Sequence, residues 1–510
     1  MKKLITLTLV LALSALTACS NNSESSKNNI AETKTAADIP TIIWQYPSAG
    51  NLGSGFQEVE DTLNAMLEKD VGARVKFVPV GLMESSKKAS LSVSVGEQLD
   101  IMLTAFTGLG PSVDTGMIIP LDDLLDKFGT DIKEQTGAAL LGSSYNSKIY
   151  GVPPANINGH GYGFYARTDI LNKYGITIDP NKKYTYEDLS KIFATVKAGE
   201  GKEYYLTIPW NTTQDPANNS FNEYDKIGGS LAAGVLMLDK GFDNTTITNL
   251  FATDAYANYA KTMYDWAQKG YISPDAAITK QSIDSLLATE KYFGMFYWND
   301  VLNAEEFSAS SGVNITTIPM YDPYVGGNGG QVINWNITKT SKNPEKAMEV
   351  LNYIYKNKEA AWLLQFGIEG KSYKVVEKTD QGTKIEYLDK DTSKLPYSQP
   401  YGIYGNRLEW PVTGTAPINK NEIVKKADES IPKSRYSPAI GYSFVQDKVS
   451  TEVAAVNTVI EQYTPAINSG LVDPDKQLPE FLSALKAAGI DKIIKENQTQ
   501  FDQWLQNKKQ

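Results

Sequence analysis

Tryptophan and asparagine occur side by side at three places in the sequence. The pairs are Trp210-Asn211, Trp298-Asn299 and Trp335-Asn336, and Asp300 directly follows the second pair. An indole ring can pack on the apolar face of a ligand, while an amide or carboxylate can hydrogen-bond its polar edge. This combination predicts non-covalent binding of a polar, ring-bearing molecule such as a sugar. The alternative for each tryptophan is a place in the core, where its N–H donates to a carbonyl.

Further aromatic and polar residues end predicted strands or occupy loops, where a ligand can reach them. Trp44 and Tyr46 end a strand predicted over 40–46, because that segment is rich in β-branched and aromatic residues. The loop over 153–163 contains glycines that allow close approach of a ligand to the backbone. The candidate binding residues are Trp44, Tyr46, Asp100, Phe106, Asn156, His160, Trp210, Asn211, Trp298, Asn299, Asp300, Trp335, Asn336, Arg407 and Trp410.

Two groups among these candidates have an ordinary structural explanation as well. Asn156 and His160 lie in a glycine-rich loop that can simply turn the chain. Arg407 can stack on a ring such as Trp410 and bind a carboxylate, or it can form an internal ion pair with Glu409. Both explanations stay open at the level of sequence.

The sequence offers little for catalysis or metal binding. It contains one histidine and one cysteine, so it cannot form an intrachain disulfide or a histidine-rich metal site. It also lacks the G-x-S-x-G, Walker A, H-E-x-x-H and EF-hand patterns. We therefore expect no enzyme, no cofactor and no metal. A glycoside hydrolase remains the enzymatic alternative, because acidic residues are plentiful and two carboxylates about 5 to 10 Å apart would suffice.

Length and charge narrow the class of protein. At roughly 150 residues per domain, 510 residues predict two or three domains, and 41% hydrophobic residues exclude a disordered polymer. The formal net charge is −10, and no basic stripe interrupts it. An acidic surface repels phosphate backbones, so we expect no nucleic-acid partner.

The first residues predict a lipoprotein. Lys2 and Lys3 precede an apolar run over 4–15 that is too short to span a bilayer, as in a signal peptide. The segment ends Leu-Thr-Ala-Cys, which resembles the lipobox of bacterial lipoproteins, with Cys19 as the lipidated residue. We expect a signal peptide over 1–18, a flexible tether over 19–39, and attachment to the cell membrane through the lipid alone, on the extracytoplasmic face of a Gram-positive bacterium. The alternative is a secreted protein with a coincidental cysteine.

The segment after the tether predicts an α/β fold. The strand over 40–46 is followed by a helical pattern, in which Val59, Leu63, Met66 and Leu67 share one face, and then by an alternating strand over 73–80. A strand, helix and strand in this order favour an open, mainly parallel sheet. Ligands bind such sheets at the carboxyl ends of the strands.

Several short motifs occur in an order that resembles a known family. They are GEQLDI over 96–101, GMIIPLDD over 116–123, KIYGVP over 148–153, YARTDIL over 165–171, FGMFYWND over 293–300 and KNPEKAMEVLNYIY over 342–355. This order resembles the family 1 extracellular solute-binding proteins of ABC importers, the sugar-binding relatives of maltose-binding protein. The segment over 437–504 resembles the longer LplA-like lipoprotein subgroup, which carries an uncharacterised C-terminal region.

The resemblance implies a two-lobe, type II-like periplasmic-binding-protein fold of the α/β class with three interlobe crossings. The crossings map to about 153–156, 292–296 and 331–335. An N-terminal lobe would contain 40–153 plus 296–331, and a C-terminal lobe 156–291 plus 336–440. Residues 441–510 would form an added C-terminal helical region.

The implied function is capture of a carbohydrate, in particular an oligosaccharide, between the lobes, and its delivery to the permease subunits of an ABC transporter. The protein would act as a monomer, and closure of the lobes requires no covalent step. The alternatives are a peptide-binding or sensory lipoprotein and a carbohydrate-active enzyme.

Overall fold

A four-stranded sheet forms the centre of the first lobe, with strand order β12-β3-β1-β2. We use a computed structural model, which describes residues 39–48, 52–105, 109–208, 223–228, 230–279, 281, 283–327 and 333–508. Strands β1 (Thr41–Ser48), β2 (Arg74–Gly81) and β3 (Ile101–Ala105) are parallel, and β12 (Ile333–Ile337) runs antiparallel to β3. The signal peptide, the lipidated Cys19 and nearly all of the tether predicted from the sequence lie outside the described residues.

The predicted strand-helix-strand unit is confirmed. Helix α1 (Phe56–Asp70) connects β1 to β2 and buries Val59, Leu63 and Leu67 in the first-lobe core. Because these residues recur at helical spacing, one face of α1 covers the sheet. Other elements of this lobe are α2 (Ser85–Ser94), α3 (Gly110–Asp114), α4 (Asp122–Phe128), α5 (Thr130–Thr136), α6 (Ala138–Leu141), β4 (Ser144–Tyr145), β5 (Lys148–Ile149), α12 (Pro344–Lys356), α13 (Lys358–Phe366), β13 (Tyr373–Thr379) and β14 (Gly382–Tyr387).

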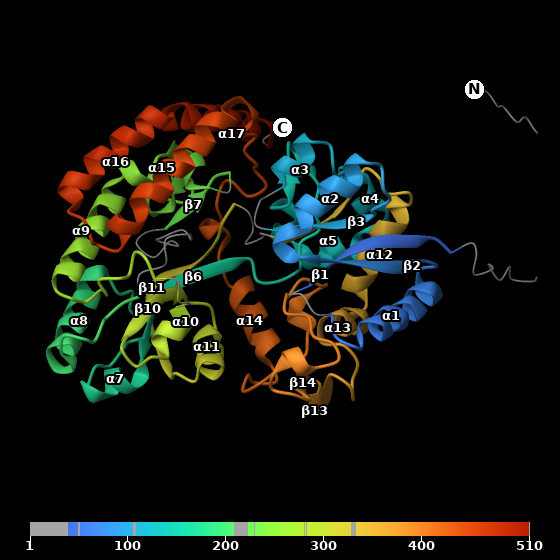
Figure 1. Cartoon of the computed structure of the whole chain (residues 1–510), viewed down its shortest axis with the longest axis horizontal. Helices are drawn as coiled ribbons and strands as arrows, with labels where there is room; N and C mark the ends of the chain where they lie inside the picture. Colours follow the sequence, from blue (N-terminus) through green and yellow to red (C-terminus); the bar gives the residue numbers. More distant parts are fainter. Residues whose placement is uncertain are drawn as a thin grey trace, which may run out of the picture. The chain divides into compact units, whose positions relative to one another are not determined.

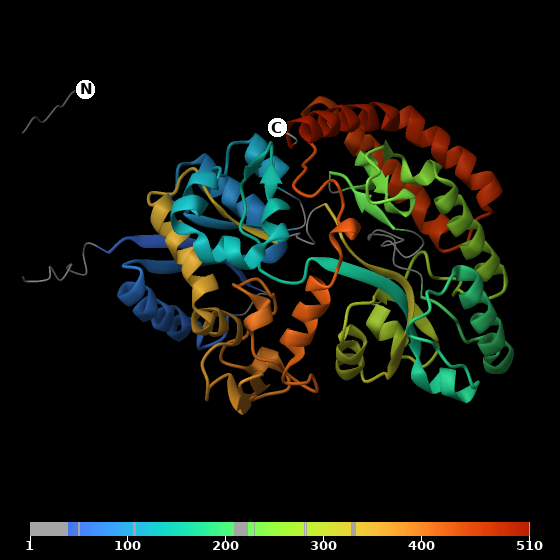
Figure 2. The ribbon, with the colours of Figure 1, turned by 180° about the vertical axis from the view of Figure 1, so that it is seen from behind.

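The second lobe is built on a three-stranded antiparallel sheet, with β6 (Gly159–Arg167) between β10 (Gly294–Trp298) and β11 (Ile315–Val325). A smaller sheet contains β7 (Tyr224–Lys226), β8 (Val235–Met237) and β9 (Ile247–Thr248). The helices are α7 (Thr168–Lys173), α8 (Tyr186–Glu200), α9 (Asp254–Gln268), α10 (Ile283–Leu287) and α11 (Asn303–Ser311). Figures 1 and 2 show the two lobes from opposite sides.

The predicted C-terminal helices are present and belong to the second-lobe core. They are α15 (Ser450–Asn468), α16 (Pro474–Ala488) and α17 (Ile490–Lys508). Val456, Phe481 and Ile493 share one buried cluster with Trp266 of α9. The ring of Phe481 packs edge-on against that of Phe251 at 4.9 Å. Because this apolar surface is continuous, the helices complete the second lobe and do not form a separate body.

The chain passes between the two cores at three places, one of which differs from the expected positions. The first crossing lies between Val152, which pairs with β12, and the start of β6. The second lies between the end of β11 and the start of β12, and the third follows α14 (Lys420–Glu429). The expected crossing at 292–296 is wrong, because β10 continues the second-lobe sheet.

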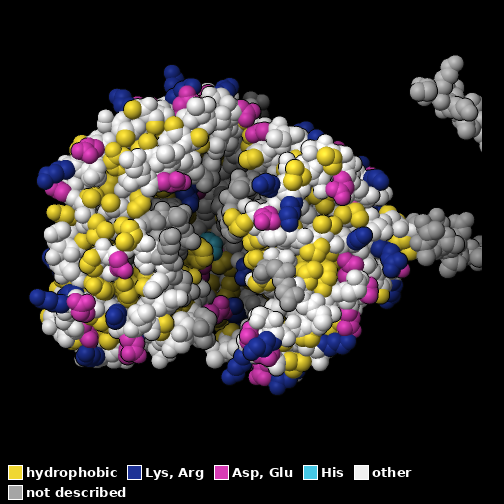
Figure 3. All heavy atoms as spheres, in the orientation of Figure 1, with side chains coloured by type: hydrophobic (Ala, Val, Ile, Leu, Met, Phe, Trp, Pro, Cys, Tyr) yellow, Lys and Arg dark blue, Asp and Glu magenta, His cyan; other side chains and the backbone are white. Residues whose placement is uncertain are grey.

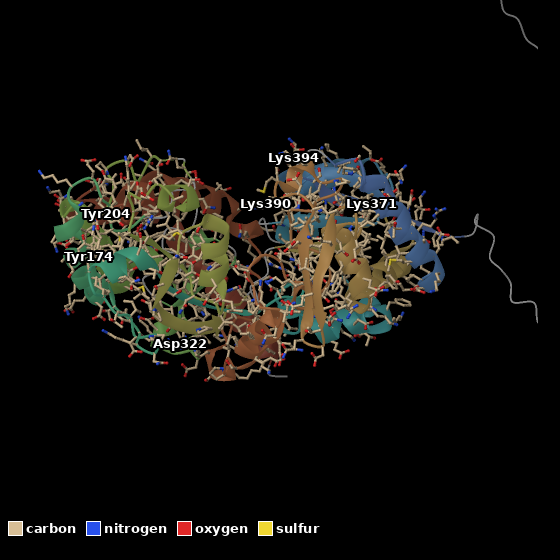
Figure 4. All side chains as sticks on the ribbon, turned by 90° about the horizontal axis from the view of Figure 1, so that it is seen from below. Tyr174, Tyr204, Asp322, Lys371, Lys390 and Lys394 are labelled. Carbon is tan, nitrogen blue, oxygen red and sulfur yellow. The ribbon has the colours of Figure 1, made fainter. Side chains whose placement is uncertain are left out.

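The expected lobe boundaries after residue 291 are therefore corrected. We expected 296–331 in the N-terminal lobe, but β10 and β11 both pair with β6, which satisfies their backbone hydrogen bonds within the second lobe. We expected 336–440 in the C-terminal lobe, but α12 and α13 pack in the first-lobe core. Figure 4 shows the corrected lobes. Asp322 of β11 lies on the side of Tyr174 and Tyr204, in the second lobe, whereas Lys371, Lys390 and Lys394 lie on the other side, in the first lobe.

Two of the crossings are tied to the second lobe by a buried carboxylate. Asp225 of β7 accepts hydrogen bonds from the Gly327 amide at 2.7 Å and from the Ser437 hydroxyl at 2.5 Å. Gly327 precedes the second crossing, and Ser437 lies on the third. Burial raises the pKa of Asp225 to about 6, although both hydrogen bonds favour the ionised form.

Within the described residues, we find no helix with the length and apolar character needed to cross a membrane.

Candidate functional site

One edge of the first-lobe sheet borders a hollow between the lobes. Ser48 and Gly81 are aligned at the carboxyl ends of β1 and β2, and Ala105 ends β3 opposite Ile333 of β12. Since β12 directly follows the second crossing, this edge is the one turned toward the second lobe. Figure 3 shows that the surface is hollowed between the lobes, at the edge of the sheet where an open α/β fold places its ligand.

The first-lobe wall of the hollow combines apolar and polar side chains. A recess of about 780 Å³ is lined by Ser48, Leu52, Pro79, Val80, Gly81, Leu82, Met83, Glu84, Lys88 and Tyr401. Met83 is 74% exposed, which is unusual for so large an apolar side chain. Lys88 and Glu84 form an exposed ion pair at 3.2 Å. This wall offers both apolar contact and hydrogen-bonding groups.

The second-lobe wall carries an imidazole stacked on an indole. The rings of His160 and Trp298 lie 5.4 Å apart at an angle of 26°. His160 Nδ1 lies 2.7 Å from Asp300 Oδ2, and the Gly161 amide donates to Asp300 Oδ1 at 3.2 Å. Trp298 is 38% exposed. The histidine-coloured side chain at the base of the hollow in Figure 3 is His160, the single histidine of the chain.

Strand register explains why these residues meet. Strand β6 begins at the first crossing, and its Tyr162 pairs with Trp298 at the end of the antiparallel β10. His160 and Asp300 therefore lie side by side just beyond that pair. The His160 side chain is 26% exposed. Because Asp300 accepts from Nδ1, the Nε2 atom is the ring nitrogen left for a ligand.

Helix α14 fixes the first crossing beside this histidine. Asp428 accepts hydrogen bonds from the backbone amides of Asn158 and Gly159 at 2.8 and 3.0 Å, and from Asn158 Nδ2 at 2.9 Å. Lys420 forms an ion pair with Glu306 of α11. These bonds hold the start of β6, and with it His160, in a defined position.

The charges around His160 stabilise its protonated form. Burial alone would lower the pKa of the imidazole, but the hydrogen bond to Asp300 and the charges of Asp300 and Asp428 outweigh it. The pKa of His160 is therefore raised above its ordinary value of 6.5.

A pH-dependent stability follows from this shift. A histidine with a raised pKa stabilises the fold fully below the pKa of the unfolded chain, near 6.5, and this contribution is lost as the pH rises through the folded-state pKa. We expect the melting temperature of the wild type, relative to that of His160→Gln, to fall as the pH is raised above about 6.5. Thermal unfolding of both proteins from about pH 5.5 to 9 measures this. A difference that stays constant with pH would contradict the charged pair.

Five candidate binding residues are buried in the first lobe and present no surface to a ligand. They are Trp44, Tyr46, Asp100, Trp335 and Asn336, each with at most 3% exposure. Trp335 donates its indole N–H to the Ile403 carbonyl at 2.8 Å and packs edge-on against Trp44 at 5.2 Å. For these tryptophans the core interpretation is the right one.

The buried polar candidates organise the first lobe. Asp100 accepts from the Ile43 and Lys342 amides at 2.8 and 3.0 Å and from the Ser341 hydroxyl at 2.5 Å. Asn336 donates to the Tyr150 carbonyl at 2.8 Å. Because these hydrogen bonds connect separate segments, both residues have a structural role.

The remaining candidates divide into three groups. Asn156 and Asn299 are partly exposed beside the His160 wall. Arg407 is exposed on the short helix Arg407–Glu409, with its guanidinium 5.8 Å from the Trp410 ring centre, and its backbone amide bonds the Ala155 carbonyl of the first crossing. Phe106, Trp210 and Asn211 lie outside the described residues.

The residues of the first-lobe wall were not among the binding residues predicted from the sequence. Met83, Glu84 and Lys88 follow the carboxyl end of β2, where the strand-end rule could have located them. Tyr401 and Asp428 carried no such signal, because they come close to the site only through tertiary packing.

The fold and the interlobe site are those of a solute-binding protein. The chain belongs to the bacterial extracellular solute-binding protein family, whose model matches residues 49–361, more than half of the chain. Residues 438–506 match a second model, a domain of unknown function (DUF3502). This confirms the family that the motif order resembles, and it places the protein in an extracytoplasmic class.

Relatives with known names point to carbohydrates. A carbohydrate ABC transporter substrate-binding protein of Streptococcus pneumoniae serotype 4 is 28% identical over 98% of this chain and 97% of its own. A crystal structure of the N-glycan transport solute binding protein NgtS from S. pneumoniae is 27% identical, with a TM-score of 0.77 over 92% of this chain and 100% of that one. For NgtS in complex with Man5GlcNAc the identity is 26% and the TM-score 0.66, over 92% and 99% of the two chains.

Proposed function

We propose that this protein is the substrate-binding component of a carbohydrate ABC importer and captures an oligosaccharide between its two lobes. The observation that carries the proposal is the exposed Trp298 ring on the second lobe, stacked on His160, together with a recess of about 780 Å³ on the first lobe. The glycan-bound structure of the relative NgtS supports the same class of ligand.

Each wall of the hollow supplies one part of sugar recognition. The Trp298 ring offers an apolar face for the C–H side of a sugar, and His160 Nε2 and Asn299 offer polar atoms for its hydroxyls. The first-lobe wall offers Met83 and Tyr401 with the Glu84–Lys88 pair. A recess of this size suits several sugar units better than one.

Capture requires movement of the lobes rather than chemistry. A ligand that contacts both walls stabilises the closed arrangement by its difference in affinity for the two states. The closed form then presents the sugar to the permease subunits. The protein acts as a monomer in this scheme.

The carboxylates beside His160 argue against the hydrolase alternative. Asp300 accepts from His160 and from the Gly161 amide, and Asp428 accepts from the Asn158 and Gly159 amides. These hydrogen bonds give both carboxylates a structural role, because they fix the start of β6 and the His160 ring. The arrangement supports binding.

A thermal-shift screen tests the proposal against its alternatives. The chain from Pro40 to Gln510, which forms one compact unit, is melted with mannose-containing oligosaccharides, with monosaccharides and with short peptides. An oligosaccharide at about 100 times its dissociation constant should stabilise the protein by about 2.7 kcal/mol. Stabilisation by peptides alone, or release of new reducing ends during incubation, would overturn the proposal.

The same proposal places the protein on the outer face of the cell membrane, held by a lipid on Cys19. We expect Cys19→Ala to leave the precursor uncleaved and without its lipid, because the cysteine sulfur is the atom that is modified. Metabolic labelling with a fatty acid and the mass of the membrane-bound protein measure this. Normal lipid labelling of Cys19→Ala would refute the anchor.

A further inference from the structure

The segment that enters the C-terminal region lies between the two lobes. Residues 441–447, which we call the strap, follow the third crossing and precede α15. At Gly441 an added Cβ would lie 3.8 Å from Trp504 of α17, so the end of that helix is close to the strap. The strap belongs to the region that matches a domain of unknown function.

One set of strap residues anchors it firmly to the second lobe. Phe444 is buried in the second-lobe core, and the Tyr442 hydroxyl donates to Asn497 Oδ1 of α17 at 2.7 Å. Gln500 of α17 accepts from the Val445 amide at 3.0 Å and donates to its carbonyl at 2.9 Å. Gln446 donates to the Gly228 carbonyl at 3.2 Å. The strap therefore moves with the second lobe.

The alternate residues of the strap contact the first lobe. The Ser443 hydroxyl donates to the Ser144 carbonyl of β4. At Gly441 an added Cβ would lie 3.5 Å from the Leu141 carbonyl oxygen of α6, so the two backbones approach closely. The strap therefore contacts both lobes at once.

Asp447 opposes the contact with the first lobe that Ser443 makes. Asp447 faces Asp114 of α3, which accepts hydrogen bonds from the Tyr145 hydroxyl at 2.8 and 2.9 Å. Burial raises the pKa of Asp114, the hydrogen bond from Tyr145 opposes this, and the charge of Asp447 together with a side-chain hydrogen bond to Asp447 raises the pKa further. When both carboxylates are ionised, their charges repel each other across the lobes, which weakens the contact that Ser443 strengthens.

We propose that the strap is a conformational restraint, through which the C-terminal region holds the lobes in the ligand-free arrangement and so sets the apparent affinity for the sugar. The open hollow in Figure 3 supports the assignment of this arrangement to the ligand-free state. So does the TM-score of 0.77 to the crystal structure of NgtS, against 0.66 to NgtS in complex with Man5GlcNAc. The affinity part of this inference rests on the proposed function, whereas the lobe arrangement does not.

Substitutions at the two strap residues should act in opposite directions. Ser443→Ala removes one hydrogen bond of the ligand-free arrangement, so the closed state gains population and oligosaccharide affinity rises about two- to tenfold. Asp447→Asn removes the like charge opposite Asp114, so affinity falls. Thr458→Ala is the matched control, because Thr458 donates its hydroxyl to Ala454 within α15 and contacts no first-lobe residue in the described part of the chain.

Distances between the lobes test the inference without any ligand. Spin labels are placed on Lys127→Cys of α4 and Lys191→Cys of α8, since Cys19 is the only natural cysteine and lies outside the chain from Pro40 to Gln510. The inference predicts more of the closed distance with Ser443→Ala, less with Asp447→Asn, and no change with Thr458→Ala. The titrations use Man5GlcNAc as the probe.

Two results would refute the proposed restraint, and a different result would refute the proposed function. Distance distributions of Ser443→Ala and Asp447→Asn that equal the wild type refute the restraint. An affinity of Ser443→Ala that is unchanged or lower refutes its direction. If the wild type binds no oligosaccharide at all, the proposed function fails, while the ligand-free distances still decide the role of the strap.

Discussion

Replacing Trp335 by alanine is expected to lower the free energy of unfolding by about 3–5 kcal/mol, because it removes a fully buried large side chain. Trp335 is 1% exposed, and its ring packs against Trp44 at 5.2 Å and Tyr404 at 5.5 Å. The substitution also leaves the Ile403 carbonyl without its indole donor. Trp335 lies on β12, directly after the second crossing, so the loss falls on the first-lobe core.

Urea unfolding followed by circular dichroism measures this loss. Trp298→Ala serves as the matched control, since Trp298 is an exposed tryptophan on the other lobe and should cost less than about 1 kcal/mol of stability. If Trp335→Ala left the stability unchanged and removed ligand binding, its assignment to the core would be wrong.

Trp298→Ala is expected to weaken oligosaccharide binding about 30-fold, or about 2 kcal/mol, with the fold intact. The exposed indole offers an apolar surface on the second-lobe wall, and it is held in place by stacking on His160. Truncation removes that surface and also the ring that stacks on the imidazole, whose Nε2 atom we propose to bind the sugar.

Isothermal titration of the wild type and the variant measures this effect. Trp298→Phe is the control variant, because it keeps an aromatic ring and should retain most of the affinity for the sugar. Equal affinity of Trp298→Ala and the wild type for every bound sugar would remove Trp298 from the site.

Local patterns predicted the parts of the fold that local residues determine. The apolar spacing of Val59, Leu63 and Leu67 predicted α1, and strand composition predicted β1 and β2 in a parallel sheet. The order of short motifs indicated the family and a helical C-terminal region. These features depend on residues close together in the chain, so the sequence shows them directly.

The site itself was predicted only in part, because burial depends on distant segments. Trp298-Asn299 and Trp335-Asn336 show the same pattern. Trp298, however, is exposed at the end of β10, whereas Trp335 is buried between Trp44 and Tyr404. Nothing next to either tryptophan distinguishes them. The same reason explains the wrong lobe boundaries, since the partner of β10 is β6, more than a hundred residues earlier.

The most direct test of the central claim is hydrogen exchange of the chain from Pro40 to Gln510 with and without a bound oligosaccharide. Capture between the lobes predicts slower exchange at both edges of the hollow, in peptides covering 79–88 of the first lobe and 159–162 and 298–301 of the second. Protection confined to one lobe, or found only away from these segments, would contradict binding in this hollow.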